Sequence, residues 1–111
     1  MAKVLIIDVD GKDYRFGLDR NEIRRGEKKG LRLKDFEDMP IDQITTLWEV
    51  GLHKYQPKLT EVQCEALYDK YLEEDGDLME VIEFLMKEYA HFVPTLQTDT
   101  PKVKKARYEE I

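Results

Sequence analysis

The stretch that decides the fold runs from Pro40 to Leu72 and reads PIDQITTLWEVGLHKYQPKLTEVQCEALYDKYL. Apolar side chains recur every three or four residues after Pro40, which predicts an amphipathic helix that packs on a core. Pro40 is expected at the first helical position, where its missing N–H is no loss. Pro57 ends this helix, and a second one begins with a capping box formed by Thr60 and Gln63. The stretch therefore predicts two helices joined by a short turn.

A β-hairpin is predicted over residues 3–17, ahead of the two helices. Asp10-Gly11 lies between two apolar runs, and this dipeptide favours a type I′ turn, which needs positive φ at both central residues. Two strands alone are marginally stable, so we expect the ribbon to lie on helices or to pair with another chain. The turn fixes the register, with Leu5 opposite Phe16, Ile7 opposite Tyr14 and Asp8 opposite Asp13.

Two further helices complete an α+β fold that is mainly helical. A short basic helix is expected from Asp19 to Lys29, opened by a capping box of Asp19 and Glu22. A last helix opens at Asp77 and stops at Pro94. Residues 1–94 are expected to form a single domain, and residues 95–111 a flexible tail that folding does not need. The expected core comprises Leu5, Ile7, Phe16, Ile44, Leu47, Trp48, Leu52, Leu67, Tyr71, Ile82, Leu85 and Tyr89.

Composition limits the classes of function. The net charge of −6 disfavours general nucleic-acid binding, because a phosphate backbone would be repelled. No apolar run is long enough to cross a bilayer, and we expect no signal peptide. A single cysteine indicates a reducing compartment. Charge is unevenly placed, however: residues 19–34 carry seven Lys/Arg against three Asp/Glu, and residues 61–88 carry ten Asp/Glu against two Lys.

Three candidate chemical sites have simpler explanations. Residues 5–11 resemble the first motif of haloacid-dehalogenase-type phosphotransferases, but the chain has no serine and the pattern suits a hairpin turn. Residues 69–80 are rich in carboxylates, but their glycine falls two places too late for an EF-hand loop. His53, His91 and Cys64 lack a fourth ligand for zinc, and Cys64 is expected to be buried. We therefore expect no enzyme activity, no metal and no cofactor.

The residues around Trp48 resemble a known family. Leu47-Trp48-Glu49-Val50-Gly51-Leu52-His53-Lys54-Tyr55, followed by Gln56-Pro57-Lys58-Leu59-Thr60, is similar to a segment of the tail assembly chaperones of long-tailed phages and prophages of Gram-positive bacteria. The similarity covers residues 4–93 and includes the short opening hairpin. It implies a non-enzymatic chaperone that binds the tape-measure protein and the tail-tube protein in the host bacterial cytoplasm and is absent from the mature virion.

The last predicted helix is the expected partner site. Its apolar residues fill an arc wider than one core contact needs, and the excess lies on one flank, with Phe84 isolated on the polar side. Methionine adapts to irregular partners, so this flank suits the tape-measure protein or, in its absence, a second copy of the chain. The candidate partner-binding residues are Met79, Met86, Ala90, Leu85 and Tyr89.

Two other functions remain open at this point. A small acidic adaptor or inhibitor that binds a host protein would share the single-domain, acidic character. A nucleic-acid-binding accessory protein would use the basic segment at residues 20–34. A helix-turn-helix over residues 41–74 is disfavoured as a DNA reader, because its second helix is strongly acidic.

Overall fold

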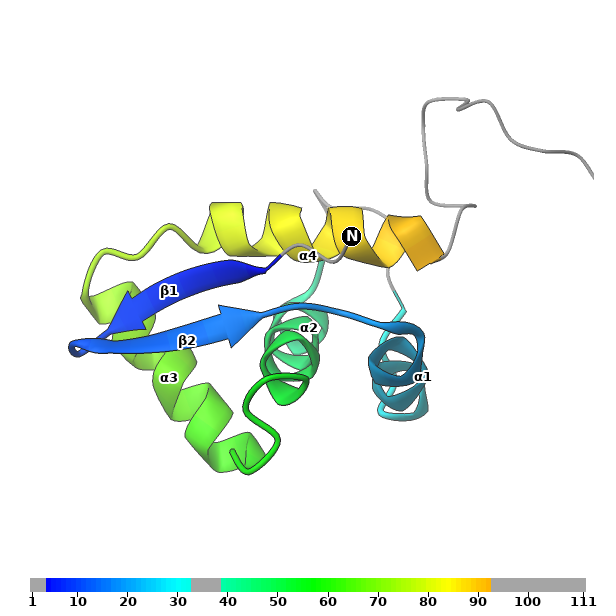
Figure 1. The fold of residues 1–111 in the computed structure, drawn as a ribbon, viewed down its shortest axis with the longest axis horizontal. Coiled ribbons are helices and arrows are strands. Elements are labelled where there is room, and N and C mark those ends of the chain that lie inside the picture. Colours follow the sequence, from blue (N-terminus) through cyan, green and yellow to red (C-terminus); the bar gives the residue numbers. More distant parts are fainter. Residues whose placement is uncertain (1–3, 33–38, 93–111) are drawn as a thin grey trace, which may run out of the picture.

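The computed structural model describes residues 4–32 and 39–92. The elements follow in the order β1 (Leu5–Val9), β2 (Lys12–Phe16), α1 (Arg20–Lys28), α2 (Ile41–His53), α3 (Glu61–Glu73) and α4 (Leu78–Phe92). The α+β fold with an N-terminal hairpin and four helices is confirmed for these residues. α2 lies at the centre and contacts α1, α3, α4 and β2, while α4 runs along the start of the hairpin (Figure 1). The predicted flexible tail at residues 95–111 lies outside the described part of the chain.

The hairpin has the predicted turn and register. Asp10 and Gly11 have φ values of 54° and 79°, as a type I′ turn requires. The Asp8 carboxylate accepts a hydrogen bond from the Gly11 N–H at 2.9 Å, and Glu74 accepts one from the Asp10 N–H at 3.0 Å. The hairpin tip is thereby tied to the end of α3. The paired residues are Leu5 and Phe16, Ile6 and Arg15, Ile7 and Tyr14, Asp8 and Asp13, and Val9 and Lys12.

Hydrogen bonds from α2 and from the turn that follows it hold the backbone of the hairpin in place. The Gln56 side-chain amide accepts from the Arg15 N–H and donates to the Arg15 carbonyl, both at 2.8 Å. It therefore satisfies the backbone groups of Arg15, as a neighbouring strand would. The Gly17 N–H donates to the Gly51 carbonyl at 3.1 Å. A Cβ atom at Gly51 would lie 2.7 Å from Leu85, so glycine is what lets the ribbon and α4 approach α2 this closely.

The helix ends largely follow the predicted caps. Thr60 and Gln63 form the reciprocal capping box, and Asp77 accepts from the Glu80 N–H at 3.1 Å. Asp19 caps α1, accepting from the Glu22 N–H at 2.8 Å. The expected place of Pro40 is wrong by one residue. Its ψ of 156° is extended and its carbonyl accepts from the Ile44 N–H, so it is the N-cap and α2 begins at Ile41.

The core surrounds Trp48, which is 1% exposed. Its ring packs edge-on against Phe16 at 4.8 Å and against Tyr68 at 5.4 Å, and its indole N–H donates to the Cys64 carbonyl at 3.0 Å. Three predicted core residues are only partly buried: Leu5 and Leu67 border surface grooves, and Ile44 lies in the first turn of α2. The expected burial of Cys64 is confirmed. The buried apolar residues that the sequence prediction missed are Val9, Leu18, Ile23, Leu31, Val50, Tyr68 and Val81.

None of the helices in the described ranges is both long and apolar enough to cross a membrane.

Candidate functional site

The predicted partner-binding residues lie at different depths on α4. Met79 is 54% exposed, whereas Met86 and Ala90 are half-buried. Leu85 and Tyr89 are buried in the core of the chain and are not accessible to a partner in this structure. Their side chains lie on the face of α4 that packs inward, because Leu85 meets Gly51 and Tyr89 reaches α1. The remaining residues, Met79, Met86 and Ala90, form the methionine flank of α4. That this flank binds a partner stays a prediction.

Tyr89 connects α4 to α1 through a hydrogen bond. Its hydroxyl donates to the Glu27 carboxylate at 3.2 Å. Burial, reinforced by the negative charge of Glu27, raises the pKa of Tyr89 to about 12, so the hydroxyl keeps its proton at neutral pH. This face of α4 therefore anchors the helix, and binding must use another face.

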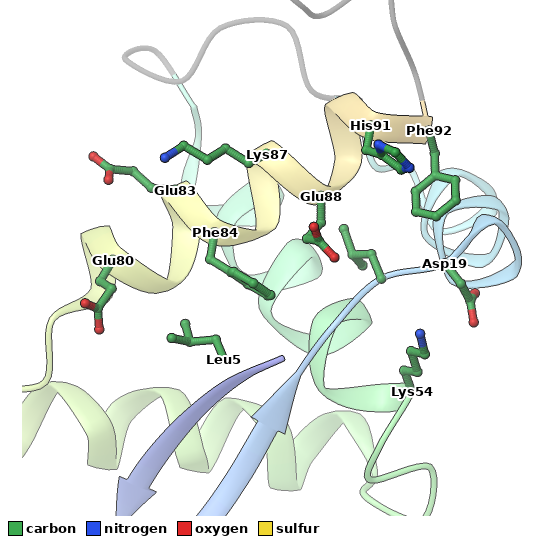
Figure 2. Close-up of a pocket in the computed structure, with 11 residues that line it drawn as sticks. Leu5, Asp19, Lys54, Glu80, Glu83, Phe84, Lys87, Glu88, His91 and Phe92 are labelled. Atoms are coloured by element: carbon green, nitrogen blue, oxygen red, sulfur yellow. The ribbon is translucent and has the colours of Figure 1, made fainter. Parts of the chain in front are cut away.

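The other flank of α4 borders a groove of about 680 Å³. Figure 2 shows Phe84 projecting from α4 toward Leu5 at the start of β1, with Phe92 and Lys54 farther along the groove. The four apolar residues that line it are Leu5, Leu18, Phe84 and Phe92. The polar residues around them are Asp19, Lys54, Glu80, Glu83, Lys87, Glu88 and His91.

The helical repeat explains which residues of α4 border the groove. Positions 80, 83, 84, 87, 88 and 91 recur every three or four residues, so they share one side of the helix. The sequence pattern placed Phe84 alone on a polar face. The fold brings Leu5 and Leu18 to the same place from the other end of the chain, and the groove acquires an apolar floor.

The groove is acidic, since four carboxylates line it against two lysines. Asp19 is used as the helix cap of α1. Glu80, Glu83 and Glu88 make no ion pair with any residue in the ranges 4–32 and 39–92. Glu80 and Glu83 are exposed and Glu88 is half-buried, so all three remain at least partly hydrated and can meet a cationic group without first breaking an ion pair within the described residues.

A second charged cluster, between α1, α2 and α3, is organised in the opposite way. Arg25 donates two parallel hydrogen bonds to the Glu49 carboxylate, at 2.9 and 3.2 Å, and Lys29 lies 3.3 Å from the same carboxylate. Burial lowers the pKa of Arg25, but Glu49 and Glu22 outweigh it, so the net shift is upward. Lys29 also pairs with Glu61 and lowers the pKa of that carboxyl group. Arg25 and Lys29, which belong to the basic segment at residues 20–34, therefore form ion pairs within the molecule.

The second buried carboxylate of this cluster belongs to Glu22, which is 6% exposed. Its Oε1 atom lies 2.9 Å from Nδ1 of His53 and 3.4 Å from Nε of Arg25. Sequence reasoning expected Glu22 to complete a capping box with Asp19. The carboxylate turns to α2 instead, because His53 and Arg25 satisfy it there. No signal in the sequence pairs these residues, since they are brought together only by the packing of α1 on α2.

Cys64 and the histidines do not form a nucleophilic pair in the part of the chain described. Cys64 is 2% exposed, and burial raises its pKa to about 11. Its thiol therefore stays protonated at neutral pH, which makes it a poor nucleophile. The described residues also hold no cluster of three or more His, Cys, Asp or Glu placed to bind a metal.

Comparison with known proteins identifies a family. No curated protein and no solved structure matches the chain. A family described as a domain of unknown function, DUF5055, matches residues 1–109. Because this match spans nearly the whole sequence, the chain belongs to the DUF5055 family.

Proposed function

We propose that this protein is a phage tail assembly chaperone that binds the tape-measure protein through α4 and aids assembly of the tail tube. The proposed activity is binding, without catalysis, in the cytoplasm of the host bacterium. The chaperone would then be left out of the mature virion. Its other proposed partners are the tail-tube protein and a second copy of the chain.

The observation that carries the proposal is the groove along α4. An amphipathic helix binds a groove by placing its apolar stripe on the floor and its polar residues at the rim. The floor here is formed by Leu5, Leu18 and Phe84. The rim is formed by Glu80, Glu83 and Glu88, which have no ion pair within residues 4–32 and 39–92. A volume of about 680 Å³ has room for several side chains of such a helix. The resemblance around Trp48 supports the identity of the partner.

The groove is a better binding surface than the methionine flank of the same helix. Met86 already packs partly against the core, and Met79 projects singly into solvent. The groove combines a hollow with apolar contact and charge, and these three features together give a docking surface both affinity and orientation.

The test is coexpression of the full chain with the tape-measure protein, followed by measurement of how much tape-measure protein stays soluble. Phe84→Glu places a charge on the groove floor and is expected to abolish the protection. Met86→Glu changes the other flank, and Val62→Glu changes an exposed position of α3, so both are expected to protect as the parent does. Circular dichroism and thermal melting establish that each variant is folded.

A second variant covers the case in which Phe84→Glu unfolds the domain. Glu80→Lys together with Glu83→Lys reverses the rim charge without touching the apolar floor, and we expect it to reduce protection. Full protection by this variant and by folded Phe84→Glu would remove the site from the groove. Loss of protection with Met86→Glu alone would place the partner on the methionine flank.

A further inference from the structure

The sequence that follows α4 is opposite in charge to the groove that α4 borders. α4 ends at Phe92, and Phe92 itself lines the groove. Residues 101–108 read PKVKKARY and carry four Lys/Arg with no Asp or Glu. The chain has a net charge of −6, so a run of this kind is uncommon in it; the other is residues 28–34, which also carry four Lys/Arg without an acidic residue. α4 is the described element nearest to residues 101–108 in the sequence, and the groove that it borders is acidic.

We infer that residues 101–108 of this chain dock in the groove along α4 of the same molecule. The basic side chains of the segment would pair with the rim carboxylates Glu80, Glu83 and Glu88. This inference goes beyond the proposed function, because it holds whether or not the groove also receives the tape-measure protein.

The chain length permits the contact. The groove extends along α4 from Phe92 back to Glu80, a helical distance of about 18 Å at 1.5 Å per residue. The nine residues from Phe92 to Pro101 span up to roughly 30 Å when extended. The basic segment therefore reaches every part of the groove without any change in the fold. A second copy is not required.

The charges make the contact specific for a basic occupant. Glu80, Glu83 and Glu88 have no cationic partner among the described residues, and Lys54 and Lys87 are the only lysines lining the groove. An occupant with several Lys/Arg gains attraction from each carboxylate, whereas an acidic occupant is repelled. Val103 and Tyr108 also give the segment apolar groups suited to a floor that contains Leu5 and Phe84.

Docking of this kind makes the C-terminal segment a competitor for any other ligand of the groove. A tethered segment has a high effective concentration, so even a weak contact occupies the groove much of the time. A ligand must displace it and therefore binds with a reduced apparent affinity. Because the attraction is between exposed charges, the contact weakens as salt is added.

The test uses the full chain with a spin label at Ala106→Cys. Cys64 does not compete for the label, because it is buried and its pKa is raised to about 11. In an isotope-labelled sample at low salt, we expect loss of amide peak intensity at Phe84, Lys87 and Glu88. The loss should be largely reversed at high salt and should be absent at Val62 on α3.

Two charge-reversal variants are matched to this experiment. Glu80→Lys/Glu83→Lys/Glu88→Lys changes the groove rim, and we expect it to restore the α4 peaks. The control, Glu65→Lys/Asp69→Lys/Glu73→Lys, changes three exposed carboxylates of α3 with helical spacing, and the loss of intensity should persist. Equal restoration by both variants would overturn the inference, because it would show attraction to net charge alone.

A mixed sample separates the molecule's own segment from that of a second copy. Isotope-labelled chain without a spin label is mixed with spin-labelled chain that is not isotope-labelled. We expect no loss of α4 peak intensity in this mixture. A loss there, or full α4 peaks in the directly labelled chain, would overturn the inference. The readout needs no tape-measure protein, so its failure is distinct from a failure of the proposed function.

Discussion

The Glu49 carboxylate of α2 and the groove carboxylates of α4 lie in contrasting environments. Glu49 on α2 is 8% exposed and is held by Arg25 and Lys29. The carboxylates that α4 presents to its groove have no ion pair within the described residues. Taking a carboxylate out of water costs several kcal/mol unless cations and hydrogen bonds compensate. The charge of Glu49 is thus part of the folded core, whereas the groove charges of α4 add little to folding and can be used for recognition.

The largest expected effect comes from removing the buried charge. Glu49→Ala leaves Arg25 and Lys29 without their shared partner, and breaking a fully buried pair costs about 3–5 kcal/mol. We expect a loss of about 2–3 kcal/mol in the free energy of unfolding, because the side chains of both cations are 29% exposed and partly hydrated. Chemical denaturation of the variant and the parent measures the difference.

The matched control for that substitution is Glu65→Ala on α3. Glu65 is exposed and has no ion pair among the described residues, so its removal should change the unfolding free energy by less than about 0.5 kcal/mol. Equal losses from the two substitutions would show that the Arg25–Glu49 pair has no special structural role.

A smaller effect is expected on the inner face of α4. Tyr89→Phe removes the hydrogen bond to Glu27 and should cost about 1 kcal/mol at neutral pH. The pKa of Tyr89 is raised from 10.0 to about 12, so the folded state holds this proton more tightly than the unfolded chain. The resulting stability is present below pH 10 and is lost as the pH rises toward 12.

The phenylalanine variant lacks this titration, so the stability difference between parent and variant should shrink as the pH rises above 10. Denaturation curves collected from neutral to alkaline pH measure the difference. Tyr68, Tyr71 and Cys64 also have raised pKa values, but they are present in both proteins and cancel in the comparison. Parallel stability profiles would contradict the assignment of the raised pKa to Tyr89.

The sequence predicts the local structure well because local chemistry determines it. Asp10-Gly11 specifies a turn of one type, and that turn sets the strand register. The caps at Thr60 and Asp77 are local signals in the same sense. Helical spacing likewise identifies Trp48 and Leu85 as core residues.

The groove and the buried charges were not predictable in this way, because both depend on contacts between distant segments. Leu5 and Phe84 are 79 positions apart in the sequence and meet only after the hairpin packs near α4. Helical spacing placed Tyr89 in the core, but nothing in the sequence shows that its hydroxyl reaches Glu27 on another helix. The same holds for Glu49, whose partner Arg25 lies on the facing helix.

The most direct test of the contrast is the triple variant Glu80→Gln/Glu83→Gln/Glu88→Gln, measured for stability and for protection of the tape-measure protein. We expect an unfolding free energy within about 0.5 kcal/mol of the parent, since partly or fully exposed carboxylates with no ion pair among the described residues contribute little. We also expect a clear loss of soluble tape-measure protein on coexpression. Marked destabilisation of the triple variant with undiminished protection would contradict the contrast, because the charges on α4 would then serve the fold and not the partner.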